Sequence, residues 1–158
     1  MIAIADEAAL YLLEFVDRRG LEKEIENMRI KLSVAIIPGT NQILQHLENE
    51  LQEYFEGTRF SFQTPITDEI GSSFQIEVWR ILRRIRPGST ISYKDLAIEI
   101  GNPKAYRAVA RANGANQISL LIPCHRVINT NGDIGGYGGG IQRKSWLLEL
   151  EKKYNNML

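Results

Sequence analysis

The chain has 158 residues, of which 44% are hydrophobic and 24% charged, a composition typical of a globular protein with a buried core. No stretch approaches the ~20 uninterrupted apolar residues of a membrane helix, and no secretory or import leader is recognisable, so we expect a cytoplasmic, intracellular protein without membrane contact. The single cysteine, Cys124, excludes an internal disulfide, and with only two histidines the chain cannot build a thiolate-rich zinc site.

The formal net charge of zero conceals two halves of opposite charge. Residues 1–78 hold 6 basic and 14 acidic side chains, a net charge of −8, whereas residues 79–158 hold 13 basic and 5 acidic ones, a net charge of +8. The basic excess is strongest over residues 79–111, which favours contact with a polyanion. The alternative is a solvated basic face that docks on the acidic half, and charge alone leaves both interpretations open.

The N-terminal half has the pattern of a small mixed α/β unit. Weak alternation over residues 1–16 predicts a hairpin-like pair of strands, and the charged residues 18–29 predict a short surface helix. Residues 32–37 are apolar and predict a further strand. Apolar residues at helical spacing predict a helix over 41–55, which Gly57 ends.

A connector separates the two halves. Residues 57–71 contain turn-forming glycine and proline among alternating apolar residues, which predicts an extended segment and a domain boundary. We place one domain at residues 1–65 and the second at 66–158. Ser72 and Gln75 then stand in capping-box spacing and predict a helix that ends before Pro87.

Two short helices are predicted over residues 93–100 and 103–113. Ser92 is the expected N-cap of the first helix, and Asn102 followed by proline is the expected start of the second. Helices joined by so tight a turn are typical of a helix-turn-helix, although many helical hairpins bind no DNA. The basic excess over the same residues favours the DNA-binding interpretation.

The second of these helices carries small residues around two arginines, Arg107 and Arg111. Such a surface suits close contact with the DNA backbone and a narrow groove better than readout of base edges in the major groove. The alternative is that its alanines pack against the core. They are Ala105, Ala108, Ala110 and Ala112.

Cys124 lies where an apolar run, residues 118–128, is interrupted by Pro-Cys-His-Arg. A lone cysteine is commonly a small core residue. Here, however, a proline precedes it and His125 and Arg126 follow it in a positively charged half, conditions that lower the thiol pKa and favour the thiolate. Neighbouring side chains of a strand point to opposite faces, so His125 is expected to act on the thiol through a water.

A glycine-dense loop over residues 135–140 follows and precedes a final amphipathic helix that contains Trp146. No Gly-Lys-Ser/Thr follows the glycines, so a phosphate-binding loop is not predicted. Close approach of the backbone to a flat ligand, with Tyr137 as an aromatic wall, explains them better.

Together these motifs closely resemble the O6-alkylguanine-DNA alkyltransferases, also called methylated-DNA–protein-cysteine methyltransferases. The resemblance covers residues 70–151, whereas the N-terminal half matches only in layout. The motifs that carry it are Pro-Cys-His-Arg-Val at 123–127, Gly-Gly-Tyr at 135–137, Trp-Leu-Leu-Glu-Leu-Glu at 146–151, Tyr-Lys-Asp-Leu-Ala at 93–97 and Gly-Asn-Pro-Lys-Ala at 101–105.

The resemblance implies an α+β fold: a small ribonuclease-H-like α/β N-terminal domain, then a mainly helical, winged-helix-like domain with a helix-turn-helix. It implies a monomer that binds double-stranded DNA in the minor groove and flips an O6-alkylguanine out of the stack. The implied activity is DNA repair by irreversible, single-turnover alkyl transfer to the protein, without a cofactor or a metal.

The resemblance also implies residue roles. Cys124 would accept the alkyl group, His125 would be its water-mediated base, and Glu151 would orient and stabilise that base. Asn116 would fix the turn beneath this network, and Tyr93 would hydrogen-bond the guanine ring nitrogen and help neutralise the leaving guanine.

Further roles concern DNA and the substrate pocket. Arg107 would fill the space left by the flipped base, and the carbonyls of Cys124 and Val127 would accept from the exocyclic amine. The Gly138 amide would face the alkylated oxygen. Glycines 138–140 leave no side chains over the alkyl group, so we expect room for a benzyl group. Further DNA contacts are expected from Lys104, Ala105, Ala108 and Arg111, and further pocket contacts from Tyr137 and Gly139.

The chain departs from relatives that bind a structural zinc in the N-terminal domain, because it offers only Cys124, His46 and His125. Gly138 also stands where members often carry a larger residue. Two other classes are rivals. Alkyltransferase-like proteins bind lesions but replace the nucleophile, typically with tryptophan, and the presence of Cys124 argues against them. A cysteine–histidine peptidase would normally place its base far from the cysteine in sequence.

Overall fold

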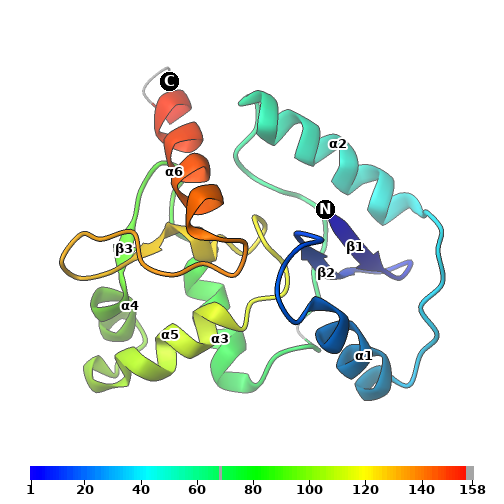
Figure 1. Ribbon diagram of the computed structural model, residues 1–158, viewed down its shortest axis with the longest axis horizontal. Helices are drawn as coiled ribbons and strands as arrows, with labels where there is room; N and C mark the ends of the chain where they lie inside the picture. The colour runs from blue at the N-terminus through cyan, green and yellow to red at the C-terminus, as the bar shows by residue number, and fades with distance from the viewer. Residues whose placement is uncertain (68, 156–158) are drawn as a thin grey trace.

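The computed structural model describes residues 1–67 and 69–155. Each half of the chain has one two-stranded sheet, and Figure 1 draws α1 and α2 on opposite sides of β1–β2. The elements follow in this order: β1 (Ile2–Ala5), β2 (Leu10–Glu14), α1 (Leu21–Leu32), α2 (Gln42–Glu56), α3 (Ser73–Leu82), β3 (Ile91–Ser92), α4 (Tyr93–Glu99), η1 (Pro103–Ala105), α5 (Tyr106–Gly114), η2 (Cys124–Arg126), β4 (Val127–Ile128) and α6 (Ile141–Asn155).

The predicted N-terminal hairpin is confirmed, since β1 pairs antiparallel with β2. β2 also bonds to segments far along the chain. Leu10 forms a parallel bridge with Ile66 of the connector, and Leu13 forms one with Ile118, shortly before the cysteine. The connector and the segment before Cys124 are therefore both attached to β2.

The predicted strand over residues 32–37 is wrong. Helix α1 continues through Leu32 and ends at Ser33, whose φ of 54° is left-handed, and the structure has no strand between this residue and α2. Pro38 has no backbone N–H to donate to a sheet, and Ile37 remains exposed.

Side-chain caps begin three of the helices, and the predicted caps at Ser72 and Ser92 are confirmed. The Asn41 side chain accepts from the Leu44 N–H at the start of α2, and Ser72 and Gln75 form the expected capping box of α3. The Ser92 side chain accepts from the Asp95 N–H at the start of α4. These caps satisfy N–H groups that a helix leaves unpaired, and they fix where each helix begins.

The second of the two predicted short helices begins later than predicted. Residues 103–105 form a 3-10 turn, α5 starts at Tyr106, and the Asn102 side chain caps nothing. The reason lies in the preceding helix, because the backbone N–H of Asn102 bonds to the carbonyl of Ala97 and so belongs to the end of α4. Gly101, with a φ of 79°, permits this tight turn.

One hydrophobic cluster contains side chains from both halves. The Trp79 indole N–H also donates to the carbonyl of Ala112 at 2.8 Å and ties α3 to α5. The division at residues 65 and 66 stays a prediction. Members of the cluster include Leu10, Leu13, Leu47, Tyr54, Val78, Leu82, Leu96, Val109, Ile118 and Leu147.

Helix α6 differs from the predicted amphipathic helix in what it buries. Its inner face carries Lys144 and Glu151, both 0% exposed, beside Leu147, whereas Trp146 is half exposed. Buried charges persist only where partners compensate their lost hydration, so this face points to a polar site. No helix of the described chain is both long and apolar enough to cross a membrane.

Candidate active site

Cys124 begins a 3-10 turn, η2, that leads directly into β4. β4 pairs in parallel with β3, and the residue after β3 is Tyr93, the first residue of α4. This pairing brings Tyr93 to the cavity of Cys124 although 30 residues separate them in sequence. The cysteine therefore does not lie in the strand that the sequence interpretation assumed.

Asn116 holds the segment that leads to the cysteine. Its side-chain oxygen accepts from the Ile118 N–H at 2.9 Å, and its amide donates to the Ile122 carbonyl at 2.8 Å and to Cys124 Sγ at 3.1 Å. Leu120 within this segment has a left-handed φ of 72°, a conformation that costs about 1–2 kcal/mol for a residue with a Cβ. The surrounding contacts over-determine the turn and thereby fix the thiol.

The thiol opens into a cavity of about 210 Å³. Tyr93, Tyr137 and Gly138 line it as predicted, whereas Val127 and Gly139 do not. The remaining lining residues come from both halves of the chain: Glu14, Arg18, Ala110, Asn113, Gly114, Asn116, Ser119 and Gly136.

The predicted thiolate is wrong for the protein without substrate. Burial raises the pKa of the Cys124 thiol to about 11, although the hydrogen bond from Asn116 lowers it. Cys124 is only 6% exposed, so the lost hydration of a thiolate outweighs the attraction of nearby positive charges. The thiol is protonated at neutral pH and needs a base.

His125, the residue after Cys124, is the candidate for that base. Its ring is fully buried, with Nε2 2.9 Å from Glu151 Oε1, while Nδ1 has no hydrogen-bond partner among the residues described. Burial lowers the pKa of His125 despite the neighbouring carboxylate, so the ring is neutral. With Nε2–H donated to Glu151, the lone pair is on Nδ1, which is the atom free to accept a proton.

Glu151 is held as a carboxylate by many donors. It accepts from the Tyr54 hydroxyl at 2.7 Å, from the Gly88 N–H at 3.1 Å and from Arg126 at 2.8 and 2.9 Å. Burial alone would raise the pKa of Glu151, but the hydrogen bonds from His125 and Arg126 outweigh it and lower that pKa. A carboxylate so fixed orients the imidazole and stabilises its protonated form.

Lys144 ties the glycine loop to β4. Its ammonium donates to the Val127 carbonyl at 2.6 Å and to the Gly136 carbonyl at 3.2 Å, and burial lowers its pKa to about 8. The Val127 carbonyl, predicted to accept from a guanine amine, therefore already accepts from Lys144. The Cys124 carbonyl accepts a longer bond, 3.4 Å, from the Asn113 amide.

The predicted open space is present at Gly140, where a Cβ would meet nothing within 4 Å, but not at Gly138 or Gly139. A Cβ on Gly139 would lie 2.7 Å from the Phe15 ring and 2.8 Å from the Tyr137 ring, so this buried glycine serves close packing. A Cβ on Gly138 would lie 3.0 Å from Arg18 Nε. A side chain of the N-terminal half thus occupies the space that the sequence left open.

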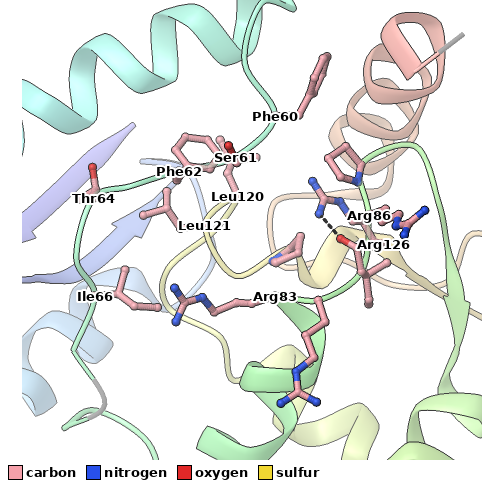
Figure 2. Close-up of a pocket in the computed structure, with 14 residues that line it drawn as sticks. Phe60, Ser61, Phe62, Thr64, Ile66, Arg83, Arg86, Leu120, Leu121 and Arg126 are labelled. Atoms are coloured by element: carbon pink, nitrogen blue, oxygen red, sulfur yellow. Dashed lines mark hydrogen bonds between the residues drawn. The ribbon is translucent and has the colours of Figure 1, made fainter. Parts of the chain in front are cut away.

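A second cavity, of about 300 Å³, is lined by other residues of the cysteine segment, Leu120, Leu121 and Pro123 (Figure 2). Part of the basic excess of residues 79–111 lies here, away from the thiol. The arginines at this cavity are Arg83, Arg84, Arg86 and Arg126, of which Arg126 donates to the Ile85 carbonyl (Figure 2).

The basic helix borders the thiol cavity. The C-terminal part of α5 supplies Ala110, Asn113 and Gly114 to the cavity wall. The predicted DNA-contacting residues Lys104, Arg107, Ala108 and Arg111 are exposed on η1 and α5, whereas Ala105 is partly buried. Ala112 is buried, so the alternative interpretation, core packing, holds for that alanine.

Sequence reasoning missed several residues of the site. Glu14 is the last residue of an apolar strand, and Arg18 follows in a loop. Neither belongs to a motif that would have indicated a site residue. Lys144 did carry a signal, because its spacing of seven from Glu151 places both on one face of a helix. Ser119 lies within the apolar run of residues 118–128, and nothing in that pattern indicates a site residue.

A buried cysteine beside a neutral histidine that a carboxylate orients defines the class of sites in which a thiol is the nucleophile. Residues 73–153 match the family model of the 6-O-methylguanine DNA methyltransferase, DNA binding domain. The chain belongs to this family.

Relatives and solved structures agree. The chain is 50% identical over 105 residues to a methylated-DNA–protein-cysteine methyltransferase of Salmonella typhimurium, covering 66% of this chain and 61% of the relative. It is 39% identical over 135 residues to the inducible enzyme of that name from Bacillus subtilis, covering 85% of this chain and 75% of the relative. The chain thus spans about three fifths of the Salmonella relative.

The crystal structure of Mycobacterium tuberculosis OGT in complex with DNA superposes with a TM-score of 0.80 at 35% identity, covering 96% of this chain and 86% of that chain. The O6-methylguanine-DNA methyltransferase of Pyrococcus kodakaraensis gives a TM-score of 0.70 at 27% identity, covering 95% and 89%. The mixed fold of helices and small sheets is therefore that of known alkyltransferase structures.

Proposed function

We propose that the protein repairs DNA by transferring an alkyl group, foremost methyl, from the O6 oxygen of guanine to the Cys124 thiol. The observation that carries this proposal is a buried cysteine that opens into a small cavity partly walled by α5 and is followed in the chain by a buried histidine hydrogen-bonded to Glu151. The family and the DNA complex of the M. tuberculosis relative support it.

The reaction follows from the charge states. The thiol proton passes through a water to Nδ1 of His125, and Glu151 stabilises the imidazolium that forms. The thiolate sulfur attacks the alkyl carbon, a C–S bond forms, and the C–O6 bond breaks with its electron pair left on guanine. The guanine, which stays in the DNA strand, then takes up one proton and His125 returns to its neutral form, so the number of protons balances.

Tyr93 would assist the leaving group. Burial raises the pKa of its hydroxyl, so Tyr93 is neutral and can donate a hydrogen bond to a guanine ring nitrogen. The product at Cys124 is a thioether, which has no low-energy route back to the thiol. Each molecule therefore acts once, and the chemistry needs no cofactor.

The finer description of fold and partner belongs to the same proposal. We infer a ribonuclease-H-like N-terminal domain and a winged-helix-like C-terminal domain in which α4 and α5 form the helix-turn-helix. This unit would bind the minor groove as a monomer, with Arg107 in the space of the flipped base. The protein would act in the cytoplasm, on nucleoid DNA.

Cys124→Ser tests the activity. Because a serine hydroxyl is nearly isosteric but far less acidic, this variant should lose transfer completely and keep DNA binding. Mass spectrometry after mixing with O6-methylguanine DNA should show one added methylene mass on Cys124 of the unaltered protein and none on the variant. An unaltered protein that binds lesions without gaining mass would indicate a lesion-binding protein instead.

Arg107→Ala tests the assignment of the DNA contact. Because Arg107 is exposed and lies outside the cavity lining, the variant should repair duplex DNA more slowly but react with free O6-methylguanine at the rate of the unaltered protein. Duplex affinity should also fall with increasing salt, as phosphate contacts require. An equal loss on both substrates would argue for a folding defect and against the assignment.

A further inference from the structure

Two charged side chains of the N-terminal half line the cavity of the reactive thiol. Glu14 ends β2 and is 2% exposed, and the side chain of Arg18 is 7% exposed. Both face a cavity whose other walls are the tyrosines, the glycine loop and α5. The chemistry proposed above assigns neither of them a step.

Arg18 cannot swing aside freely. It donates to Glu14 at 2.9 Å and to Glu24 at 2.8 and 3.1 Å, and it approaches the Gly114 carbonyl at the end of α5 at 3.5 Å. To leave its place it would have to give up two ion pairs, one of them buried, and buried pairs are costly to separate.

Glu14 is anchored on the cysteine segment. Its carboxylate accepts from the Ser119 hydroxyl at 3.0 Å and from the Phe15 N–H at 3.2 Å. The pair therefore joins β2, the segment before Cys124 and α5 into one wall. Because Arg18 Nε lies 3.0 Å from the position of a Cβ on Gly138, this wall also covers the glycine loop.

The small volume of the cavity means that the Glu14–Arg18 wall limits the size of the substrate. The cavity volume of about 210 Å³ is below the ~300–1,000 Å³ of pockets that hold drug-sized ligands. A flat base with a small substituent uses most of that space. A substituent that contains a ring would have to displace Arg18 or place an apolar face against the buried Glu14–Arg18 pair. In either case these charged groups would lose polar partners that compensate their burial.

We propose that the Glu14–Arg18 pair is a specificity determinant that limits the transferred group to methyl and other small alkyl groups. This proposal rests on the alkyl-transfer function and names its substrate class. The pair acts by occupying the space beside Gly138, not by proton transfer.

The test compares two duplexes of one sequence that carry either O6-methylguanine or O6-benzylguanine. Single-turnover rates on both give a benzyl-to-methyl ratio for each variant. The variants are the double substitution Glu14→Gln with Arg18→Ala, which leaves no unpaired buried charge at position 14, and Arg18→Lys, which keeps the charge on a slimmer head group. Arg29→Ala, which breaks the exposed pair with Glu26 in α1, is the matched control.

We expect the unaltered protein to transfer methyl at least tenfold faster than benzyl. The double variant should raise the benzyl-to-methyl ratio at least tenfold, Arg18→Lys should raise it less, and Arg29→Ala should leave it unchanged. If the pair only held the two halves of the chain together, the double variant would lower the melting temperature and slow methyl and benzyl transfer alike. An unchanged benzyl-to-methyl ratio in the double variant therefore overturns the proposal.

Equal rates of methyl and benzyl transfer by the unaltered protein also overturn it. Should the double variant fail to fold, the ratio for Arg18→Lys decides. A lack of methyl transfer by the unaltered protein would instead contradict the proposed function, so the two failures are distinguishable.

Discussion

Two buried glutamates of the site behave in opposite ways: Glu14 lines the cavity of the thiol, whereas Glu151 bonds to His125, the residue after Cys124. Glu151 accepts hydrogen bonds from four residues, and these donors lower its pKa although burial alone would raise it. Glu14 has fewer strong donors, and burial raises its pKa despite the nearby Arg18. Burial therefore does not decide the charge of a carboxylate; the number and charge of its donors do.

The same substitution at both positions separates the two environments. Glu151→Gln would leave Arg126 buried without its counter-charge and deprive His125 of its orienting carboxylate. We expect about 3–5 kcal/mol of lost stability in chemical denaturation and a roughly tenfold or greater loss of single-turnover rate, with little change in DNA affinity. An unaltered rate would contradict the role of Glu151.

The pH dependence of this stability loss has a definite sign. The folded-state pKa of Glu151 lies below its unfolded value, so its stabilisation is present above the unfolded pKa of 4.5 and is lost as pH falls further. The difference between the unaltered protein and Glu151→Gln should therefore shrink as pH falls below 4.5. A difference that grows on acidification would refute the assigned charge state.

The Cys124 thiol, whose cavity Glu14 lines, gives a second measurement. A thiol whose pKa is raised from 9.0 to about 11 forms thiolate only as pH approaches 11, so its reaction with iodoacetamide in the absence of DNA should rise about tenfold per pH unit well beyond pH 9. Mass spectrometry of labelled Cys124 measures this, with circular dichroism as the control for folding. A plateau below pH 9 would contradict the protonated resting thiol.

Glu14→Gln should have the smallest effect. Arg18 keeps Glu24 as a partner, and a glutamine oxygen can still accept from Ser119, so we expect a stability change within about 1 kcal/mol at neutral pH. The folded-state pKa of Glu14 is raised above 4.5, so protonation removes the cost of burying its charge. Acidification should therefore raise the stability of the unaltered protein relative to that of Glu14→Gln. The opposite slope to that of Glu151→Gln is the result that confirms the comparison.

Several elements were predictable because their signals are local. The caps at Asn41, Ser72 and Ser92 depend on side chains that reach backbone groups three residues away, and the structure has all three bonds. The strand predicted over 32–37 is absent, because an apolar segment forms a strand only if it finds a pairing partner elsewhere in the chain, which local sequence does not reveal. The 3-10 start before α5 depended on how the preceding helix ended.

The candidate site divides along the same line. The sequence by itself determined the reactive cysteine, its histidine neighbour and the motifs around them, because these residues lie close together in the chain and carry a recognisable pattern. Only the tertiary structure decided that the resting thiol is protonated, that Lys144 donates to the Val127 carbonyl, and that Glu14 and Arg18 line the cavity. The physical reason is that desolvation and cavity shape depend on what packs around a group, and the neighbours of Cys124 include Glu14, at the end of a strand more than 100 residues earlier in the chain.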